Sequence, residues 1–218
     1  MISFSGIDCG GKSTQMEKVF EEFKRQNMKC KMIHSRGGYT PMLEFIKNIL
    51  RTDKNSTRQE QDTYRENIHK NPKKRKLLLW FSILDLGLYY GIYFRLLELF
   101  GTVILADRYF WDSYIDFELK YSEFDFEKWT VWKFTKAIYK KPECSIIYTI
   151  PAELSVYRST LKDEPWPEPI DMRRIRIDEY MKEIENNRWN NVIDATKSID
   201  EVFEVTMECI KNENILHD

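Results

Sequence analysis

A glycine-rich stretch near the start of the chain has the residue types needed to hold phosphates. Residues 6–13 read GIDCGGKS and match the pattern GxxxxGK[ST] at every fixed position. In such a loop the glycines let the backbone turn so that its N–H groups converge on an anion, and a following helix adds partial positive charge. Lys12 would reach the β- and γ-phosphates, and the Ser13 hydroxyl would bind Mg²⁺. The stretch therefore predicts a nucleoside triphosphate site.

A second polar group follows an apolar stretch in the middle of the chain. Asp107 and Arg108 come directly after residues 103–106, which read VILA and predict a buried strand. Ligands of α/β sheets bind at the carboxyl ends of strands, so Asp107 should lie beside the glycine-rich loop. Its carboxylate could hold Mg²⁺ or orient an attacking oxygen, and Arg108 could neutralise phosphoryl charge. An ion pair that only closes the strand end is the alternative.

Strands and helices alternate along the chain, which would place these two polar groups at one sheet edge. Strands are expected at residues 2–4, 30–33, 103–106, 145–150 and 192–193. Helices are expected at residues 12–26, 42–50, 77–100, 126–139, 152–162, 170–188 and 199–211. The alternation predicts an α/β fold of the P-loop three-layer type, with a parallel sheet covered by helices on both faces. We expect one domain over residues 1–218.

Two segments need separate interpretation. Residues 163–169 read DEPWPEP, and three prolines exclude a regular helix or a central strand, so residues 159–176 are a candidate lid. Residues 77–94 are apolar with a single charge, Asp85, and contain Gly87 and Gly91 in a GxxxG spacing. A membrane span is possible by length, but the strand and polar site that follow favour a buried core helix.

Composition limits the classes of partner. The net charge is −1, from 34 basic and 35 acidic residues, which predicts no general attraction to nucleic acid or to a membrane. The four cysteines and three histidines are scattered without metal-ligand spacing, which is typical of reduced thiols in a cytoplasmic protein. The start of the chain has no basic region followed by a long apolar run, so no signal peptide is expected.

Several motifs together resemble the thymidylate kinase family over nearly the whole chain. The most specific are FSGIDCGGKSTQ at residues 4–15 and GTVILADRY at residues 101–109. Weaker similarities are HSRGGYTPMLEFIKNIL at residues 34–50, CSIIYTIPAELSVYRSTLKD at 144–163 and VIDATKSIDEV at 192–202.

The resemblance implies a kinase that transfers the γ-phosphoryl group of ATP to a nucleoside monophosphate, with Mg²⁺, and that forms a homodimer through the long apolar helix. The implied donor site comprises Gly6, Asp8, Cys9, Gly10, Gly11, Lys12, Ser13 and Thr14. The implied acceptor site comprises Asp8, Arg36, Phe81 and Arg108. Ser13 and Asp107 are the implied metal ligands, and Lys12, Asp107, Arg108 and Arg158 the implied catalytic residues.

The assignment of Arg158 follows from a departure in the loop. Family members carry a catalytic arginine either in the phosphate loop or in the lid, and Cys9 occupies the loop position here. The charge should therefore come from the lid side. Arg158 is the first candidate there, and the alternatives are Arg173, Arg174 and Arg176.

The acceptor side departs further from the family pattern. Where the family reads FAADR, residues 82–86 read SILDL, so Ser82 replaces a base-stacking phenylalanine and Leu86 a phosphate-binding arginine. Phe81, one position away, could stack on the base instead. Three functions stay open: a kinase for dTMP, a kinase with the same ATP half and another acceptor, and a nucleotide-binding module without turnover.

Overall fold

The structure is a computed structural model of the chain and describes residues 1–34, 71–162, 167–213 and 215. The chain forms two compact units. The first comprises residues 1–35, 96–115 and 141–218, and the second comprises residues 36–95 and 116–140. The expectation of a single domain, with a lid at residues 159–176, stays a prediction.

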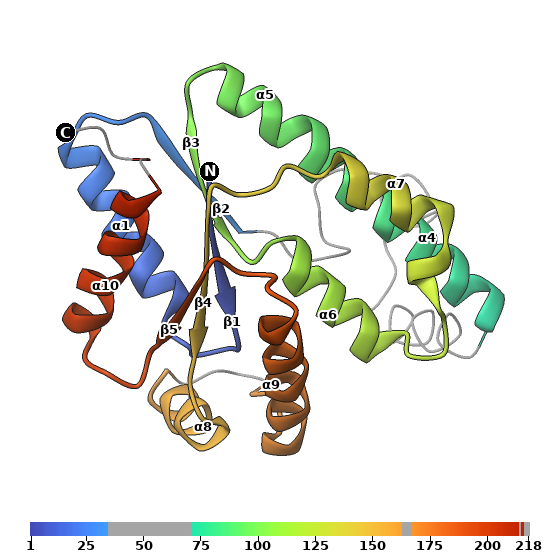
Figure 1. Cartoon of the computed structure of the whole chain (residues 1–218). Coiled ribbons are helices and arrows are strands. Elements are labelled where there is room, and N and C mark those ends of the chain that lie inside the picture. Colours follow the sequence, from blue (N-terminus) through green and yellow to red (C-terminus); the bar gives the residue numbers. More distant parts are fainter. Residues whose placement is uncertain (35–70, 163–166, 214, 216–218) are drawn as a thin grey trace, which may run out of the picture. The chain divides into compact units, whose positions relative to one another are not determined.

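The first unit contains a five-stranded sheet in the order β2-β3-β1-β4-β5, with every neighbouring pair parallel (Figure 1). Its strands are β1 (Ile2–Gly6), β2 (Cys30–His34), β3 (Val103–Asp107), β4 (Cys144–Thr149) and β5 (Asn191–Asp194). The central strand β1 is buried along its whole length, as is expected of a parallel sheet covered on both faces. The predicted α/β fold is confirmed.

Helices cover this sheet. They are α1 (Lys12–Arg25), α8 (Ala152–Leu161), α9 (Ile170–Glu185) and α10 (Ile199–Asn212), and α6 (Phe110–Lys120) begins in this unit. Helices α1 and α10 pack side by side, and their apolar positions are buried at helical spacing, for example Met16, Val19 and Phe23 (Figure 1). A capping box between Ser198 and Glu201 fixes the start of α10.

The second unit is helical in the part that the structure describes. It contains α4 (Pro72–Leu88), the π-helical turn η1 (Tyr89–Tyr93), the 3₁₀ turn η2 (Phe126–Lys128) and α7 (Thr130–Ile138), and α5 (Phe94–Leu99) leads back to the first unit. Helix α4 begins where the Asn71 side chain accepts hydrogen bonds from two backbone N–H groups, with Pro72 in the first turn.

The glycines of the apolar helix serve its packing against α7. A Cβ atom at Gly87 would lie 2.6 Å from the Thr135 hydroxyl, and one at Gly91 would lie 2.9 Å from the Ile138 carbonyl oxygen. The helical run Pro72–Leu99 is long and apolar enough to cross a membrane, but half of its most apolar window is buried within the protein. Buried core helices of soluble proteins have the same length and composition, and the close packing on α7 fits that interpretation.

Three sequence-based expectations need correction. Helix α6 was not predicted, although Phe110, Tyr114 and Phe117 follow a helical period. The helix expected at 126–139 is interrupted at Trp129, where ψ is 144° and the backbone is extended. The apolar helix begins earlier than expected, at Pro72. The helix expected at 42–50 lies outside the described residues.

The packing of Gly87 gives a stability prediction. Gly87→Ala should lower the free energy of unfolding by about 1–3 kcal/mol, because overpacking against Thr135 outweighs the gain of about 1 kcal/mol in helix propensity. The measurement is urea denaturation of both proteins. The double variant Gly87→Ala/Thr135→Ala removes the closest contact and should be more stable than the sum of the two single effects. A stabilising Gly87→Ala would contradict the packing.

Candidate active site

The predicted phosphate loop connects the end of β1 to the start of α1, and its backbone conformation requires glycine at one end. Gly6 has φ +132°, and a Cβ atom there would lie 2.5 Å from the Tyr148 carbonyl oxygen of β4. Gly11 has φ +91° at the N-cap of α1, and Cys9 has φ +58°. These left-handed conformations turn the chain within a few residues, as a loop that converges its N–H groups on an anion must.

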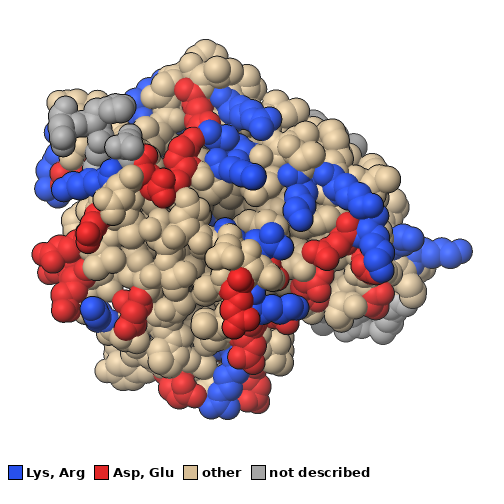
Figure 2. All heavy atoms as spheres, viewed as in Figure 1, with Lys and Arg blue, Asp and Glu red and all other residues tan. Residues whose placement is uncertain are grey.

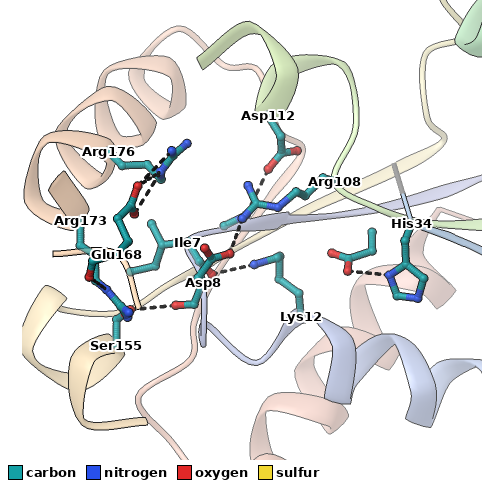
Figure 3. A network of polar contacts seen from close by, with 12 residues as sticks. Ile7, Asp8, Lys12, His34, Arg108, Asp112, Ser155, Glu168, Arg173 and Arg176 are labelled. Carbon is teal, nitrogen blue, oxygen red and sulfur yellow. Dashed lines mark hydrogen bonds and ion pairs between the residues drawn. The ribbon is translucent and has the colours of Figure 1, made fainter. Parts of the chain in front are cut away.

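Lys12 is buried within this loop. Its Nζ donates a hydrogen bond to the Ile7 carbonyl oxygen at 2.6 Å (Figure 3). Burial, followed by the charge of Arg108, lowers the pKa of Lys12 to about 8, although Asp107, Asp8 and Asp112 oppose the shift. The ammonium is therefore incompletely compensated in the nucleotide-free protein, and a bound phosphate would stabilise its charged form.

Asp107 and Arg108 lie at the same sheet edge as the phosphate loop. Asp107 pairs with Phe4 of β1, and the Arg108 N–H donates to the Phe4 carbonyl oxygen at 2.9 Å. Arg108 has φ +65°, an uncommon conformation for a residue with a side chain. Its guanidinium is nearly buried and forms an ion pair with the Asp8 carboxylate (Figure 3). The structure thus brings together Asp8, Lys12 and Arg108, which the sequence assigned to one site.

The two oxygens of the Asp107 carboxylate differ in their contacts. Its Oδ2 lies 2.9 Å from Nδ1 of His34, at the end of β2. Its Oδ1 is buried and has no hydrogen-bond partner among the described residues. Within those residues no cluster of three or more His, Cys, Asp or Glu side chains could hold a metal by itself. The unpartnered Oδ1 of Asp107 and the hydroxyl of Ser13 are oxygen donors of the kind that Mg²⁺ takes, together with water and phosphate oxygens.

A cavity of about 530 Å³ opens beside the phosphate loop. Residues 9–15 form one wall, and the others come from α8, the segment after β5 and the start of α10: Arg158, Leu161, Lys162, Ala195, Lys197, Ser198, Ile199 and Val202. This volume is typical of a site for a small organic ligand. Its position beside the loop fits a nucleotide with its phosphates in the loop.

The four candidate lid arginines differ in their surroundings. Arg158 lines the cavity and donates to the Ala195 carbonyl oxygen at 2.9 Å. Arg173 is buried and bonded to α8, Arg174 is exposed and pairs with Glu153, and Arg176 pairs with Glu168. Of these four, Arg158 is therefore the one on the wall of the cavity that the phosphate loop also lines.

The predicted acceptor residues are placed less completely. Arg36 lies outside the described residues. Phe81 is on α4 in the second unit, where its ring is partly exposed and packs edge-on against Trp80. Leu86, at the position of the family's phosphate-binding arginine, is fully buried. Their roles stay predictions.

Four side chains around the loop were missed by the sequence analysis: His34, Asp112, Ser155 and Tyr180. The position of His34 at the end of a predicted strand was a usable signal. For Ser155 and Tyr180 the sequence carried none, because their contacts join segments far apart in the chain.

Comparison with known proteins agrees with the geometry. A model of the thymidylate kinase family matches residues 4–205. The chain belongs to the thymidylate kinase family. A thymidylate kinase from Sulfurihydrogenibium sp. (strain YO3AOP1) is 25% identical over 217 residues, which cover 99% of this chain and 98% of the relative.

Family membership makes the chain a phosphotransferase. Phosphoryl transfer depends mainly on positioning and on stabilising negative charge. Lys12, Asp107 and Arg108 lie together at one sheet edge, where such groups would be needed.

The lowered pKa of Lys12 gives a pH prediction. Its folded value of about 8 lies below the unfolded value of 10.5, so the charged lysine destabilises the nucleotide-free fold below pH 8, and this cost disappears as the pH rises towards 10.5. Lys12→Met should abolish turnover, yet raise the free energy of unfolding near neutral pH by up to about 3 kcal/mol.

Denaturation of both proteins without nucleotide, at about pH 7 and about pH 10, measures the effect. The difference in favour of Lys12→Met should shrink at the higher pH. The matched control is Lys18→Met. Lys18 lies on α1 like Lys12, but it forms an exposed ion pair with Asp200 of α10, so its replacement should show no such gain in stability. A constant difference at both pH values would show that Lys12 does not carry the cost.

Proposed function

We propose that this chain transfers the γ-phosphoryl group of ATP to dTMP, with Mg²⁺ as cofactor. The observation that carries the proposal is the convergence of the phosphate loop, Lys12, Asp107 and the Asp8–Arg108 pair at one sheet edge beside a nucleotide-sized cavity. Family membership and the name of the Sulfurihydrogenibium relative support dTMP as the acceptor.

Donor binding follows from the loop and the cavity. The N–H groups of residues 10–14 and the Lys12 ammonium would hold the phosphates of ATP, and the nucleoside would occupy the cavity that Arg158 lines. Ser13 and Asp107 would hold Mg²⁺, which neutralises phosphate charge when bound. Arg158, at the cavity wall, would supply the positive charge that Cys9 cannot.

Acceptor binding rests on the other side of the loop. Arg108 would bind the acceptor phosphate or the transferred group, and Asp8, oriented by Arg108, would bind the acceptor's sugar. Arg36 and Phe81 would add a phosphate contact and a stacking surface. Each of these groups acts by orientation and charge, which is how phosphoryl transfer is accelerated.

A different acceptor is the second candidate function. Leu86 is buried, so the position at which the family carries an acceptor-binding arginine offers only an apolar side chain. A phosphate that is taken out of water needs a positively charged or hydrogen-bonding partner. The loss of the arginine would therefore weaken binding of an acceptor without a phosphate less than binding of dTMP. A nucleotide-binding module without turnover is a third possibility.

The exposed side chains bear on the oligomeric state and the cellular location of the protein. The helical run from α4 to α5 carries the exposed apolar side chains Leu77, Trp80, Ile92, Leu96 and Leu99, which fit a homodimer interface. Lys and Arg side chains are interspersed with Asp and Glu on the face drawn in Figure 2, which fits small-molecule substrates and a cytoplasmic protein better than a nucleic-acid polymer or a membrane surface.

The test of function is ADP release from Mg·ATP with a panel of nucleoside monophosphates and nucleosides. Wild-type protein should turn over dTMP, and Asp107→Asn should lower kcat by at least about 100-fold while ATP affinity changes less than about threefold. Asp194→Asn, at the exposed end of β5, is the matched control and should retain activity. Turnover of another acceptor only would favour the second candidate, and ATP binding without turnover the third.

The dimer is tested by sedimentation. Leu96→Glu should convert a dimer into a monomer, because burying a carboxylate in an apolar interface is strongly unfavourable. Val205→Glu, at a partly exposed apolar position on α10, should leave the sedimentation coefficient unchanged. A wild-type protein that sediments as a monomer would contradict the proposed homodimer.

A further inference from the structure

Helix α9, whose first half overlaps the candidate lid at residues 159–176, carries polar side chains that are buried. They are Arg173, Arg176, Tyr180 and Glu183. Arg173 and Tyr180 are seven residues apart, about two helical turns, so they lie on the same face of the helix. Neither side chain lines the nucleotide cavity, and the mechanism proposed above uses neither. Both make contacts that lead to the entry of the phosphate loop, residues 5–8.

Arg173 reaches the loop through a serine of α8. Only 1% of the residue is exposed, and its guanidinium donates to the Glu168 carbonyl oxygen at 2.9 Å, to the Ser159 hydroxyl at 3.1 Å and to the Ser155 hydroxyl. Ser155 in turn donates to the Asp8 carbonyl oxygen at 2.8 Å (Figure 3). The contact to a cation polarises the Ser155 hydroxyl and strengthens the bond it donates to the loop.

Tyr180 reaches the loop through a buried carboxylate. Its hydroxyl donates to Oδ1 of Asp112 at 2.6 Å, and Asp112 is 1% exposed. The same carboxylate accepts from the Ser5 hydroxyl at 2.5 Å and from the Gly6 N–H at 3.5 Å. It also accepts from the Tyr109 N–H at 3.0 Å, next to Arg108. One carboxylate thus joins the end of β1, the start of α6 and α9.

Mainly apolar residues line the space between these two anchors. Gly6 and Ile7 line a small cavity together with Ile177, Tyr180 and Met181 of α9. The helix therefore faces the loop entry over its middle two turns, with a polar contact at each end. Any displacement of α9 relative to the sheet has to move the loop entry or break the hydrogen bonds that run through Ser155 and Asp112.

We propose that α9 clamps the entry of the phosphate loop, with Arg173 and Tyr180 as positioning residues that act through Ser155 and Asp112. The clamp fixes Asp8, whose carboxylate holds Arg108, so the position of α9 determines where these two proposed acceptor-side groups lie. It also sets the direction of the loop N–H groups that follow Asp8. The inference rests on the proposed phosphoryl transfer but is independent of which acceptor is used.

Two serines of α8 provide a matched test. Both accept from the Arg173 guanidinium and both are buried, but only Ser155 donates to the loop, whereas Ser159 donates to Val156 of its own helix. Ser155→Ala should lower kcat about tenfold with a smaller change in KM for ATP, because misplacing a reacting group is costly. Ser159→Ala should lose about as much thermal stability as Ser155→Ala, but its kcat should stay within about twofold of the wild-type value. Equal kcat values for the two variants would overturn the clamp.

Hydrogen exchange tests the clamp without turnover. In the nucleotide-free protein, Ser155→Ala should speed amide exchange within residues 6–11, and Ser159→Ala should not. Tyr180→Phe should speed amide exchange at Gly6. This variant tests the contact through Asp112 and leaves the aromatic ring in place. Unchanged exchange in both Ser155→Ala and Tyr180→Phe would sink the inference. Wild-type protein that binds ATP but transfers nothing would sink the proposed function alone.

Discussion

The close approach of β1 and β4 at Gly6 is the constraint on which the site depends. The backbone there passes so near the Tyr148 carbonyl oxygen that a Cβ atom would lie 2.5 Å from it, and its φ of +132° turns the chain off the sheet edge. Because β1 is the central strand, this turn places the loop between the ends of β3 and β4. Lys12 then begins α1 with its side chain folded back over the loop. A side chain at residue 6 would disturb all of these positions at once.

Three carboxylates and two cations lie together at this sheet edge. Asp8, Asp107 and Asp112 surround Lys12 and Arg108, yet burial still holds the pKa of Lys12 near 8. Each acidic group has a separate partner that keeps it from neutralising the lysine: Arg108 for Asp8, His34 for Asp107, and hydroxyl and backbone donors for Asp112. A triphosphate can therefore occupy the loop without displacing a strong lysine–carboxylate ion pair.

Local patterns predicted the strands and the donor half of the site, because each depends on residues within a short window. The loop needs only glycines and a lysine at fixed spacing, and β3 needs only an apolar run before Asp107. Helix α6 was missed because its apolar positions are aromatic and alternate with acidic residues. The neighbouring Arg173 and Arg174 could not be distinguished from sequence, because tertiary packing buries one and leaves the other exposed. The lid and the single domain remain predictions.

The donor and acceptor halves of the site differ in what holds them, and this explains where the chain departs from its family. In the function proposed above, backbone N–H groups would bind the donor phosphates, and they would tolerate Cys9 as long as the turn is kept. Side chains would recognise the acceptor, so leucine at residue 86, where the family pattern has an arginine, would alter recognition directly. The α9 clamp contacts the backbone of the loop entry at Asp8 and Gly6 and the buried Ser5 and Asp112 side chains. It can therefore hold the catalytic geometry constant while the side chains that select the acceptor vary.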